Sequence, residues 1–440
     1  MVDRSWRCGR VTRRTGKNRM TIQYSPLNQK LLEVADGLMQ RIREATSDGV
    51  GITRESYGQG ETVALKILFE YCADQGLVCH FDAGANLLIQ LPEEPPGKTI
   101  LIGSHLDSVP QGGNFDGLAG VIAGILILLH LKDVPKAQQK PVRVLALRGE
   151  ESAWFGKAYM GSLALLGKLS AEDLNLQSRD TGQTLREAML QLNIPVERIE
   201  QGEPFIDLGS IEAYLELHIE QGPIMVARQW PIAAVSGIRG NIRHNRIVCK
   251  GETGHSGAVP RWMRKDAVLA CAELLSHLDE HWRVLQQMGM DLVMTCGIFS
   301  TNSASHALSV IPGEVSFSFE VRSQSDSTLE QFYQLMRHEC EEITRSRGVE
   351  FVFDRRLYTS PALMDNRWVE KFSNACKELG IASEVVASGA GHDAAVFANA
   401  GIPSGMIFIR NEFGSHNPHE AMNLEDFFLG VQALNIAVSH

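Results

Sequence analysis

Residues 99–131 read TILIGSHLDSVPQGGNFDGLAGVIAGILILLHL, and this stretch decides the fold class. It opens with a short, nearly continuous apolar run, passes through a polar loop rich in glycine, and closes with a longer apolar run. A short continuous apolar run is typical of a central strand that is covered on both faces. The longer run has the length of a helix packed on a sheet. We therefore predict a strand, loop and helix of an α/β protein.

Strands and helices alternate on both sides of this unit. Residues 26–45 and 62–76 space their apolar side chains at i, i+3 and i+4, which predicts amphipathic helices. The runs VRVLALR (142–148) and IEAYLEL (211–217) have the same apolar character as KTILIGS (98–104). We expect a mostly parallel central sheet with helices on both faces.

The pattern changes between residues 237 and 354. Here the expected order is strand, helix, strand, strand, helix, strand, which is the order of a ferredoxin-like α+β fold. The run VSFSFEV (315–321) alternates apolar and polar residues, so one face of this sheet should be buried while the other is wet or meets a partner. We predict that this segment is an inserted lid or dimerisation domain.

The pattern of the first half returns after the insert. Residues 369–379 are expected to be helical, SGMIFI (404–409) to be a buried strand, and a helix near 424–438 to close the fold. The segments 23–236 and 355–440 together form the predicted main domain.

Residues 1–22 differ from the rest of the chain in charge. They hold seven basic residues against a single acidic one, and no apolar segment of the secretory kind follows. We expect a disordered basic arm. A transit-like segment and a true translation start at Met20 are the alternatives.

Composition restricts the class of protein. The chain has 440 residues, 44% of them hydrophobic and 21% charged, and a net charge of -10 without a long basic stripe. These values argue against nucleic acid as a partner. The chain contains no run of about 18 apolar residues, which is the length needed to cross a membrane. Eight cysteines without a CxxC pair fit a reducing compartment, so we expect a cytoplasmic protein.

Several apolar runs end in side chains that can bind a metal ion. These side chains are His105, Asp107, Asp116, Glu150, Glu151, His218 and His416. In open α/β sheets, ligands bind beyond the carboxyl ends of the strands, so these residues should share one site. Imidazole and carboxylate ligands suit zinc, manganese, cobalt or nickel, and two such ions can share a carboxylate. The sequence therefore predicts a two-metal site.

Individual residues in this set suggest separate roles. Asp107 can turn back and orient the imidazole of His105, as bound histidines usually require. Asp116 lies in a glycine-rich turn where the backbone can approach an ion, although alone it would be an ordinary turn residue. Glu150 and Glu151 point in opposite directions if the segment is extended. One can then bind metal while the other takes a proton from a metal-activated water and passes it on; a solvated acidic turn is the alternative.

Seven motifs along the chain point to one family. They are HLDSVPQGGNFDG, GEES, ELHIEQGP, GHSGAVP, VIPGEV with EVR, SGAGHDA and SHNPHE. From about residue 25 onward, the chain resembles the binuclear metallo-amidases that include N-carbamoyl-L-amino-acid hydrolases, allantoate amidohydrolases and β-ureidopropionases. The resemblance implies a homodimeric hydrolase of linear amides with two divalent metal ions per subunit.

The resemblance also implies the metal ligands. One ion would be held by His105 and His218, and the other by Glu151 and His416. Asp116 would bridge the two ions.

The remaining roles follow from the same resemblance. Glu150 would be the general base and acid, and Gln221 would hold the ureido group. His255 would reach from the insert, in the family from that of the neighbouring subunit, to polarise the scissile carbonyl. Arg322 would bind the substrate carboxylate, for which a planar guanidinium is well shaped. His392 would line the same pocket.

The chain departs from the family motifs at two places, both in the insert. Ser309 replaces the asparagine that usually helps Arg322 hold the carboxylate. In the segment GHSGAVPR (254–261), this chain has Ala258, Val259 and Arg261 where many relatives have a threonine pair and a methionine. These departures leave the hydrolytic residues intact and leave the substrate side chain open.

We expect an enzyme that cleaves an N-carbamoyl amino acid to the amino acid, carbon dioxide and ammonia. An enzyme of the same construction acting on allantoate, a β-ureido acid, a dipeptide or an acylated amino acid is the first alternative. A binding protein that has kept the fold and lost catalysis is the second. The native ion, the start codon and the role of the basic arm stay open at this point.

Overall fold

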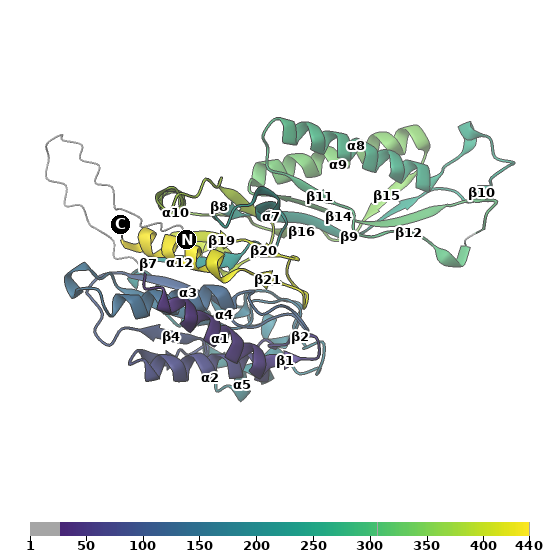
Figure 1. Ribbon diagram of the computed structural model, residues 1–440. Coiled ribbons are helices and arrows are strands. Elements are labelled where there is room, and N and C mark those ends of the chain that lie inside the picture. Colours follow the sequence, from purple (N-terminus) through teal and green to yellow (C-terminus); the bar gives the residue numbers. More distant parts are fainter. Residues whose placement is uncertain (1–26, 306, 440) are drawn as a thin grey trace, which may run out of the picture.

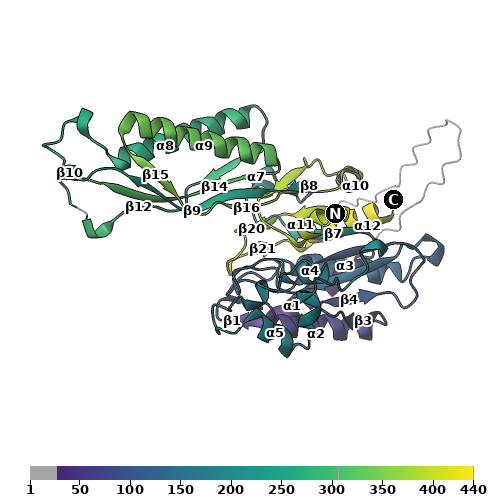
Figure 2. The same cartoon turned by 180° about the vertical axis from the view of Figure 1, so that it is seen from behind.

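The computed structural model describes residues 27–305 and 307–439, so the predicted basic arm lies outside the described residues. Figure 1 shows two lobes, a larger one around a nine-stranded sheet and a smaller one around a six-stranded sheet. Figure 2 shows the same two lobes from behind. Within the described part of the chain, every helix is too short or too polar to cross a bilayer.

The nine-stranded sheet has four parallel strands at its centre. In spatial order its strands are β17 (Ala362–Leu363), β8 (Ile232–Ile238), β19 (Ser404–Ile409), β7 (Ile211–Ile219), β5 (Thr99–His105), β6 (Val142–Leu147), β4 (Leu87–Gln90) and β3 (Val78–Phe81), with β18 (Val386–Ser388) paired to β8. The strands β19, β7, β5 and β6 run parallel, and β8 and β4 flank them in the antiparallel sense. The prediction of a mostly parallel central sheet is confirmed.

Helices cover both faces of this sheet. One face packs against α1 (Lys30–Thr46), α2 (Gln59–Asp74), α3 (Leu118–Leu131), α10 (Asn366–Glu378) and α12 (Leu424–Ser439). The other packs against α4 (Met160–Leu165), α7 (Ile224–Arg228) and α11 (Asp393–Asn399). Within β5, Ile100 and Ile102 join the first core while Leu101 joins the second. Burial on both faces explains why the central strands read as continuous apolar runs.

Helix α3 lies unusually close to strand β7. A Cβ atom at Gly120 would come within 2.3 Å of the Leu217 carbonyl oxygen, so the helix can approach this far only with glycine there. This packing brings the start of α3 under the ends of β5 and β7. The backbone N–H of Gly117, just before α3, lies 3.2 Å from Nε2 of His218.

The smaller lobe is an antiparallel sheet with two helices on one face. Its strands follow the order β11 (Val293–Thr295), β14 (Glu314–Ser323), β9 (Gly240–Lys250) and β15 (Glu350–Phe353), while β12 (Phe299–Thr301) pairs with β14 and β16 (Leu357–Thr359) with β9. The helices are α8 (Ala267–Gln287) and α9 (Asp326–Arg347). In chain order the strands lie second, third, first, fourth, which is the ferredoxin-like arrangement that the sequence predicts.

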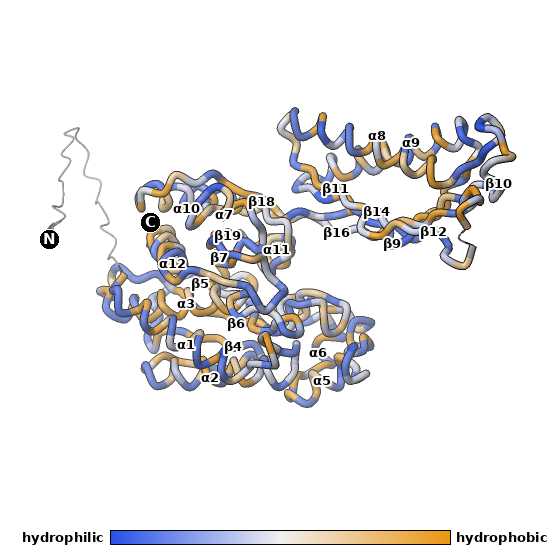
Figure 3. Tube along the Cα trace, turned by 45° about the vertical axis from the view of Figure 1, so that its right-hand side comes forward, coloured by the Kyte–Doolittle hydropathy of each residue, from blue (hydrophilic) through white to orange (hydrophobic). Residues whose placement is uncertain are grey.

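Hydrophobic patterning explains how this lobe packs. Along β14 the side chains of Val315, Phe317, Phe319 and Val321 are buried, and the residues between them are partly exposed. Helices α8 and α9 alternate between hydrophobic and hydrophilic colours along their length in Figure 3, as expected for helices with one face on a sheet.

The two lobes are joined where β8 passes into β9. Gly240 at the start of β9 is paired with Ser323 at the end of β14, and Asn241 is paired with Thr359 of β16. At the opposite end of the small lobe, β10 (Gly254–His255) pairs with β13 (Val310–Ile311). The remaining short elements are β1 (Ser47–Asp48), β2 (Gly51–Ile52), α5 (Leu185–Gln191), α6 (Val196–Glu200), β20 (Asn411–Glu412), β21 (Ala421–Met422) and the 3₁₀ turns Lys136–Gln138, Asp173–Asn175, Leu208–Ser210, Arg261–Met263 and Ser303–Ser305.

Candidate metal centre and substrate pocket

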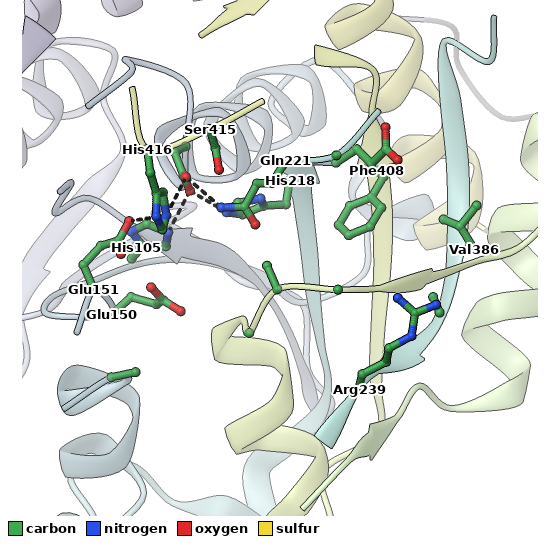
Figure 4. Close-up of a pocket in the computed structure, with 18 of the residues that line it drawn as sticks. His105, Glu150, Glu151, His218, Gln221, Arg239, Val386, Phe408, Ser415 and His416 are labelled. Atoms are coloured by element: carbon green, nitrogen blue, oxygen red, sulfur yellow. Dashed lines mark hydrogen bonds and ion pairs between the residues drawn. The ribbon is translucent and has the colours of Figure 1, made fainter. Parts of the chain in front are cut away.

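The predicted metal ligands line one cavity of about 590 Å³ at the carboxyl ends of the parallel strands (Figure 4). The ligand candidates in it are His105 in β5, Asp116 before α3, Glu151 after β6, His218 in β7 and His416 after β20. Carboxyl ends of parallel strands meet at one edge of a sheet, which explains why residues far apart in sequence converge here.

Two groups of ligand atoms share Asp116. His105, His218 and Asp116 form one group, and Asp116, Glu151 and His416 form the other. The Oδ1 atom of Asp116 lies 3.4 Å from Nε2 of His105 and 3.1 Å from Nε2 of His218. Its Oδ2 atom lies 3.6 Å from Nε2 of His416, which is itself 3.2 Å from Oε1 of Glu151. Each Asp116 oxygen therefore faces a different group, as in a bridging ligand.

The ring orientations of two histidines fit metal binding. Nδ1 of His105 lies 3.0 Å from the Asp107 carbonyl oxygen, and Nδ1 of His218 lies 2.9 Å from the Ile219 carbonyl oxygen. When Nε2 gives up its proton, the hydrogen bond at Nδ1 leaves the Nε2 lone pair of each ring free to bind an ion on the Asp116 side.

The state of Asp116 also fits a cation site. Burial alone would raise the pKa of Asp116, but His105 and His218 hold it well below the usual range of an aspartate. Its buried Oδ1 atom has no hydrogen-bond donor among the described residues. A buried carboxylate oxygen without a donor is costly unless a cation lies against it. The residues present therefore fit divalent metal ions.

Asp107 organises the site through its carboxylate. The side chain is fully buried and accepts hydrogen bonds from the Ser56 hydroxyl at 2.6 Å and from the backbone N–H groups of Glu150 and Glu151, both at 3.0 Å. Its Oδ1 atom lies 3.3 Å from Nδ1 of His105. We predicted that this carboxylate orients the imidazole. The shorter contact of the ring is to the Asp107 backbone, and the carboxylate mainly fixes the glutamate pair.

The two glutamates face different neighbours. Glu151 contacts His416, whereas the Glu150 carboxylate lines the cavity and has no hydrogen-bond partner within the described part of the chain. Burial raises the pKa of Glu150 well above its usual value, His105 opposes this shift, and the charge of Glu151 adds to it. A buried carboxyl group with a raised pKa takes up a proton more readily than a free glutamate does, as a general base must.

Gln221 lies beside the shared aspartate. Its Nε2 atom donates to Oδ2 of Asp116 at 2.8 Å, while its Oε1 atom is buried and unpaired in the described structure. Gln221 and His416 both have positive φ angles, of 62° and 59°. Such angles cost non-glycine residues roughly 1–3 kcal/mol and persist where the surrounding structure imposes them, often at functional positions.

Arg322, at the end of β14, lines the same cavity from the small lobe. Its Nη1 atom donates to the Gly389 carbonyl oxygen at 2.8 Å, and its Nε and Nη2 atoms each lie 3.0 Å from a carboxylate oxygen of Glu320. The structure thus brings Arg322 into the pocket that holds the candidate ligands.

His392 does not line this pocket, contrary to the prediction. It is buried behind the cavity, where its Nε2 atom lies 2.8 Å from the Ser388 hydroxyl and its ring packs edge-on against His218, with centroids 4.4 Å apart. It can therefore support the ring of His218 from behind.

His255 and Ser309 lie together at the far end of the small lobe (Figures 1 and 2). The N–H of Ser256 donates to the Ser309 carbonyl oxygen at 2.8 Å, and His255 is exposed. Arg322 lies eight residues along β14 from Glu314, or about 26 Å at roughly 3.3 Å per strand residue, and His255 and Ser309 lie beyond Glu314. Within one chain, neither His255 nor Ser309 reaches the metal-ligand groups.

Two buried charged residues of the site escaped the sequence analysis. Arg54 is fully buried and donates to the Leu106 carbonyl oxygen at 2.6 Å, although nothing in the sequence near it marks a strand end. Glu420 uses Oε1 to accept the backbone N–H groups of Phe115 at 2.8 Å and Asp116 at 3.2 Å. Its place in the quoted motif SHNPHE was the one available signal.

Known proteins share this fold. Residues 101–440 match the model of Peptidase family M20/M25/M40, so the chain belongs to this family. It is 32% identical over 409 residues to an N-carbamoyl-L-amino acid amidohydrolase of Geobacillus stearothermophilus, covering 90% of this chain and 96% of that one. It is also 32% identical over 396 residues to an allantoate amidohydrolase of Bacillus subtilis, covering 89% of this chain and 92% of that one.

A solved structure also has this fold. A hydantoinase/carbamoylase family amidase from Burkholderia ambifaria superposes with a TM-score of 0.81 at 26% identity, covering 94% of this chain and 98% of that one. Together with the relatives and the ligand groups, this match confirms the predicted class, a metal-dependent amidohydrolase that acts on carbon–nitrogen bonds of linear amides.

Proposed function

We propose that this protein hydrolyses an N-carbamoyl amino acid to the amino acid, carbon dioxide and ammonia, as a cytoplasmic homodimer with two divalent ions per subunit. One observation carries the proposal. A single cavity holds an aspartate shared by two ligand groups, a glutamate free to move protons, and a glutamine with an unpaired carbonyl oxygen.

The ligand groups indicate how the ions would be held. His105, His218 and Asp116 would bind one ion, and Glu151, His416 and Asp116 would bind the other. Nitrogen and oxygen ligands of this kind suit zinc, manganese, cobalt or nickel. When bound, such ions supply Lewis acidity that polarises the amide carbonyl and acidifies a water.

Glu150 is placed for the proton transfers. As the only one of the two adjacent glutamates that faces the cavity without a partner in the described structure, it takes a proton from the attacking water. Its raised pKa favours this uptake of the proton, which Glu150 then passes to the leaving nitrogen.

Gln221 is placed to recognise the ureido group. Its Oε1 atom is buried beside Asp116 and lacks a donor among the described residues. A ureido N–H supplies such a donor, which offsets the cost of that buried acceptor.

The two other substrate contacts come from the small lobe. Arg322 receives the substrate carboxylate, because its guanidinium lines the cavity and is kept in place by Glu320 and Gly389. His255 lies too far from the cavity of its own chain, so the proposed homodimer brings His255 of one chain over the site of the other.

A substrate screen of metal-loaded protein tests this function. Ammonia release should be fastest from N-carbamoyl amino acids and slower from allantoate and 3-ureidopropionate, and the release of free amino acids from dipeptides should be slower still. Preferred release from allantoate would instead support the alternative that the Bacillus subtilis relative represents. Tight binding of a ureido acid without turnover, in protein with full metal content, would establish the non-catalytic alternative.

A further inference from the structure

A second arginine lines the cavity in addition to Arg322. Arg239 lies between the end of β8 and the start of β9, at the junction of the two lobes. Figure 4 shows it beside Val386 and Phe408, on the side of the pocket away from His416 and Glu151. None of the motifs in the sequence includes it.

The hydrogen bonds of Arg239 leave one nitrogen unused. Nε donates to the two carboxylate oxygens of Asp291 at 2.9 and 3.1 Å, and Nη2 donates to Oδ1 of the same residue at 2.7 Å. Asp291 is itself fixed by the backbone N–H of Gln324 at 2.9 Å. The Nη1 group has no acceptor within the described part of the chain. The clamp therefore orients a guanidinium whose remaining donor is free for a ligand.

The free donor lies close to Arg322. A Cβ atom at Gly389 would be 3.6 Å from Nη1 of Arg239, and the Gly389 carbonyl oxygen accepts Nη1 of Arg322 at 2.8 Å. Two guanidiniums thus flank one glycine of the cavity wall, each balanced by a single carboxylate, Asp291 or Glu320. A ligand held by Arg322 through its carboxylate would place its side chain next to Arg239.

Apolar side chains lie beside Arg239. Val386, Ala387 and Phe408 line the cavity, Figure 4 shows Val386 and Phe408 beside Arg239, and Ala387 is paired with Gly237, two residues before Arg239. A short side chain with an apolar stem and an oxygen at its end would pack against these walls and accept a hydrogen bond from Nη1. A purely apolar side chain would bury the same donor without an acceptor, which is unfavourable.

We propose that Arg239 is a specificity-determining residue that binds an oxygen acceptor, a carboxylate or an amide carbonyl, on the substrate's side chain. The preferred substrates are then ureido acids with an acceptor-bearing side chain. This inference rests on the proposed function and goes beyond it, because Arg322, Gln221 and the metal ligands recognise only groups that every ureido acid has.

The alternative is that Arg239 only ties the two lobes together through Asp291. The test measures kcat/KM of the wild type and of Arg239→Met for N-carbamoyl-L-aspartate, N-carbamoyl-L-asparagine and N-carbamoyl-L-2-aminobutyrate. These three substrates share a ureido group and a carboxylate and differ at the end of the side chain. The readout is the ratio of kcat/KM for each acceptor substrate to that for the aminobutyrate compound.

We expect the variant to lower this ratio by about 10- to 100-fold. A fall for the aspartate compound alone identifies a carboxylate as the ligand, and a fall for both acceptor compounds identifies any side-chain oxygen. Arg239→Lys, which keeps one charge but cannot bind Asp291 and a substrate together, should lower the ratio while retaining the fold. Arg143→Met is the matched control, since it removes a similar two-point pair with Glu94 outside the cavity and should leave the ratio unchanged.

An unchanged ratio in both Arg239 variants would overturn the inference, whether kcat/KM stays the same or falls equally on all three substrates. Absence of ammonia release from every ureido acid in the wild type would refute the proposed function itself and the inference with it. Thermal unfolding of each variant separates loss of fold from loss of recognition.

Discussion

The guanidinium of Arg54 donates to both the side-chain oxygen of Asn114, at 3.2 Å, and its backbone carbonyl oxygen, at 3.5 Å. Asn114 lies two residues before Asp116, so this contact fixes the loop that carries the shared ligand candidate. Burial lowers the pKa of Arg54, and the charges of Glu420 and Asp107 oppose that shift. Arg54 is thus a buried cation behind a cluster of carboxylates.

Replacement of Arg54 should destabilise the protein. Arg54→Met leaves buried carbonyl oxygens without donors and removes a counter-charge, so the free energy of unfolding should fall by on the order of 3 kcal/mol or more. Urea denaturation of metal-free protein measures this. The exposed pair of Arg41 and Glu70 provides the control, because Arg41→Met should cost at most about 1 kcal/mol. Equal losses in the two variants would show that Arg54 does not support the loop.

Removal of the proposed base should separate catalysis from metal binding. Glu150→Gln keeps the shape of the side chain but cannot accept the proton, so kcat should fall on the order of 10²-fold or more while metal content stays near that of the wild type. Steady-state kinetics and elemental analysis of the same preparation provide both values. Loss of metal from the variant would mean that Glu150 is a ligand and that the two adjacent glutamates exchange roles.

Metal binding should compete with protons at His416. In the metal-free protein the hydrogen bond with Glu151 raises the pKa of His416 from 6.5 to about 9, although partial burial opposes the shift. The imidazole is therefore protonated at neutral pH and must lose its proton before it binds an ion. Affinity for the second ion should rise with pH up to about 9 and weaken as the pH falls.

Calorimetry in buffers of different ionisation enthalpy counts the protons released when the ion binds. His416→Ala should release about one proton fewer than the wild type near neutral pH. The same raised pKa means that the contact with Glu151 stabilises the metal-free fold fully below pH 6.5, and that this stabilisation disappears as the pH rises through about 9. Equal proton release from both proteins would contradict the assignment of His416 as a ligand.

Two inactive variants should restore each other if the sites are shared between subunits. His255→Ala lacks the histidine and Glu150→Gln lacks the base, but one site of a mixed dimer receives both intact residues. Subunit exchange should therefore recover part of the wild-type activity. Exchange demonstrated by a labelled subunit without any recovery would mean that His255 acts in its own chain or has no catalytic role.

The sequence predicted the main strands and helices because each is long or strongly patterned. The strand at residues 404–409 has the predicted bounds, and the ligand candidates were recognisable because most of them end such a run. Strand β8 was missed, since the alanines, serine and glycine in IAAVSGI weaken its apolar signal. The second strand expected in the insert, LVMTCGIF (292–299), is split into β11 and β12, on either side of residues 296–298.

Side-chain direction was harder to predict than position in the chain. The motif around His392 gave its residue type, but only the packing of α11 turns the ring away from the cavity and against His218. Arg54 could not be predicted as a site residue, because its role is to donate hydrogen bonds to carbonyl groups that are far away in sequence, such as that of Leu106. Arg239 was missed for the same reason, since its partner Asp291 lies 52 positions away.

The metal-ligand candidates and the departures from the family motifs lie in different lobes, and this separation has an evolutionary consequence. The metal-ligand candidates all belong to the nine-stranded lobe, whereas the departures from the family motifs, Ser309, Ala258, Val259 and Arg261, all belong to the other. Grafting the small lobe of a relative onto this chain would therefore exchange much of the recognition surface and leave the hydrolytic ligands untouched. New substrates are accessible to such a scaffold by recombination at Gly240 and Thr359, without passing through an ancestor that has lost its metals.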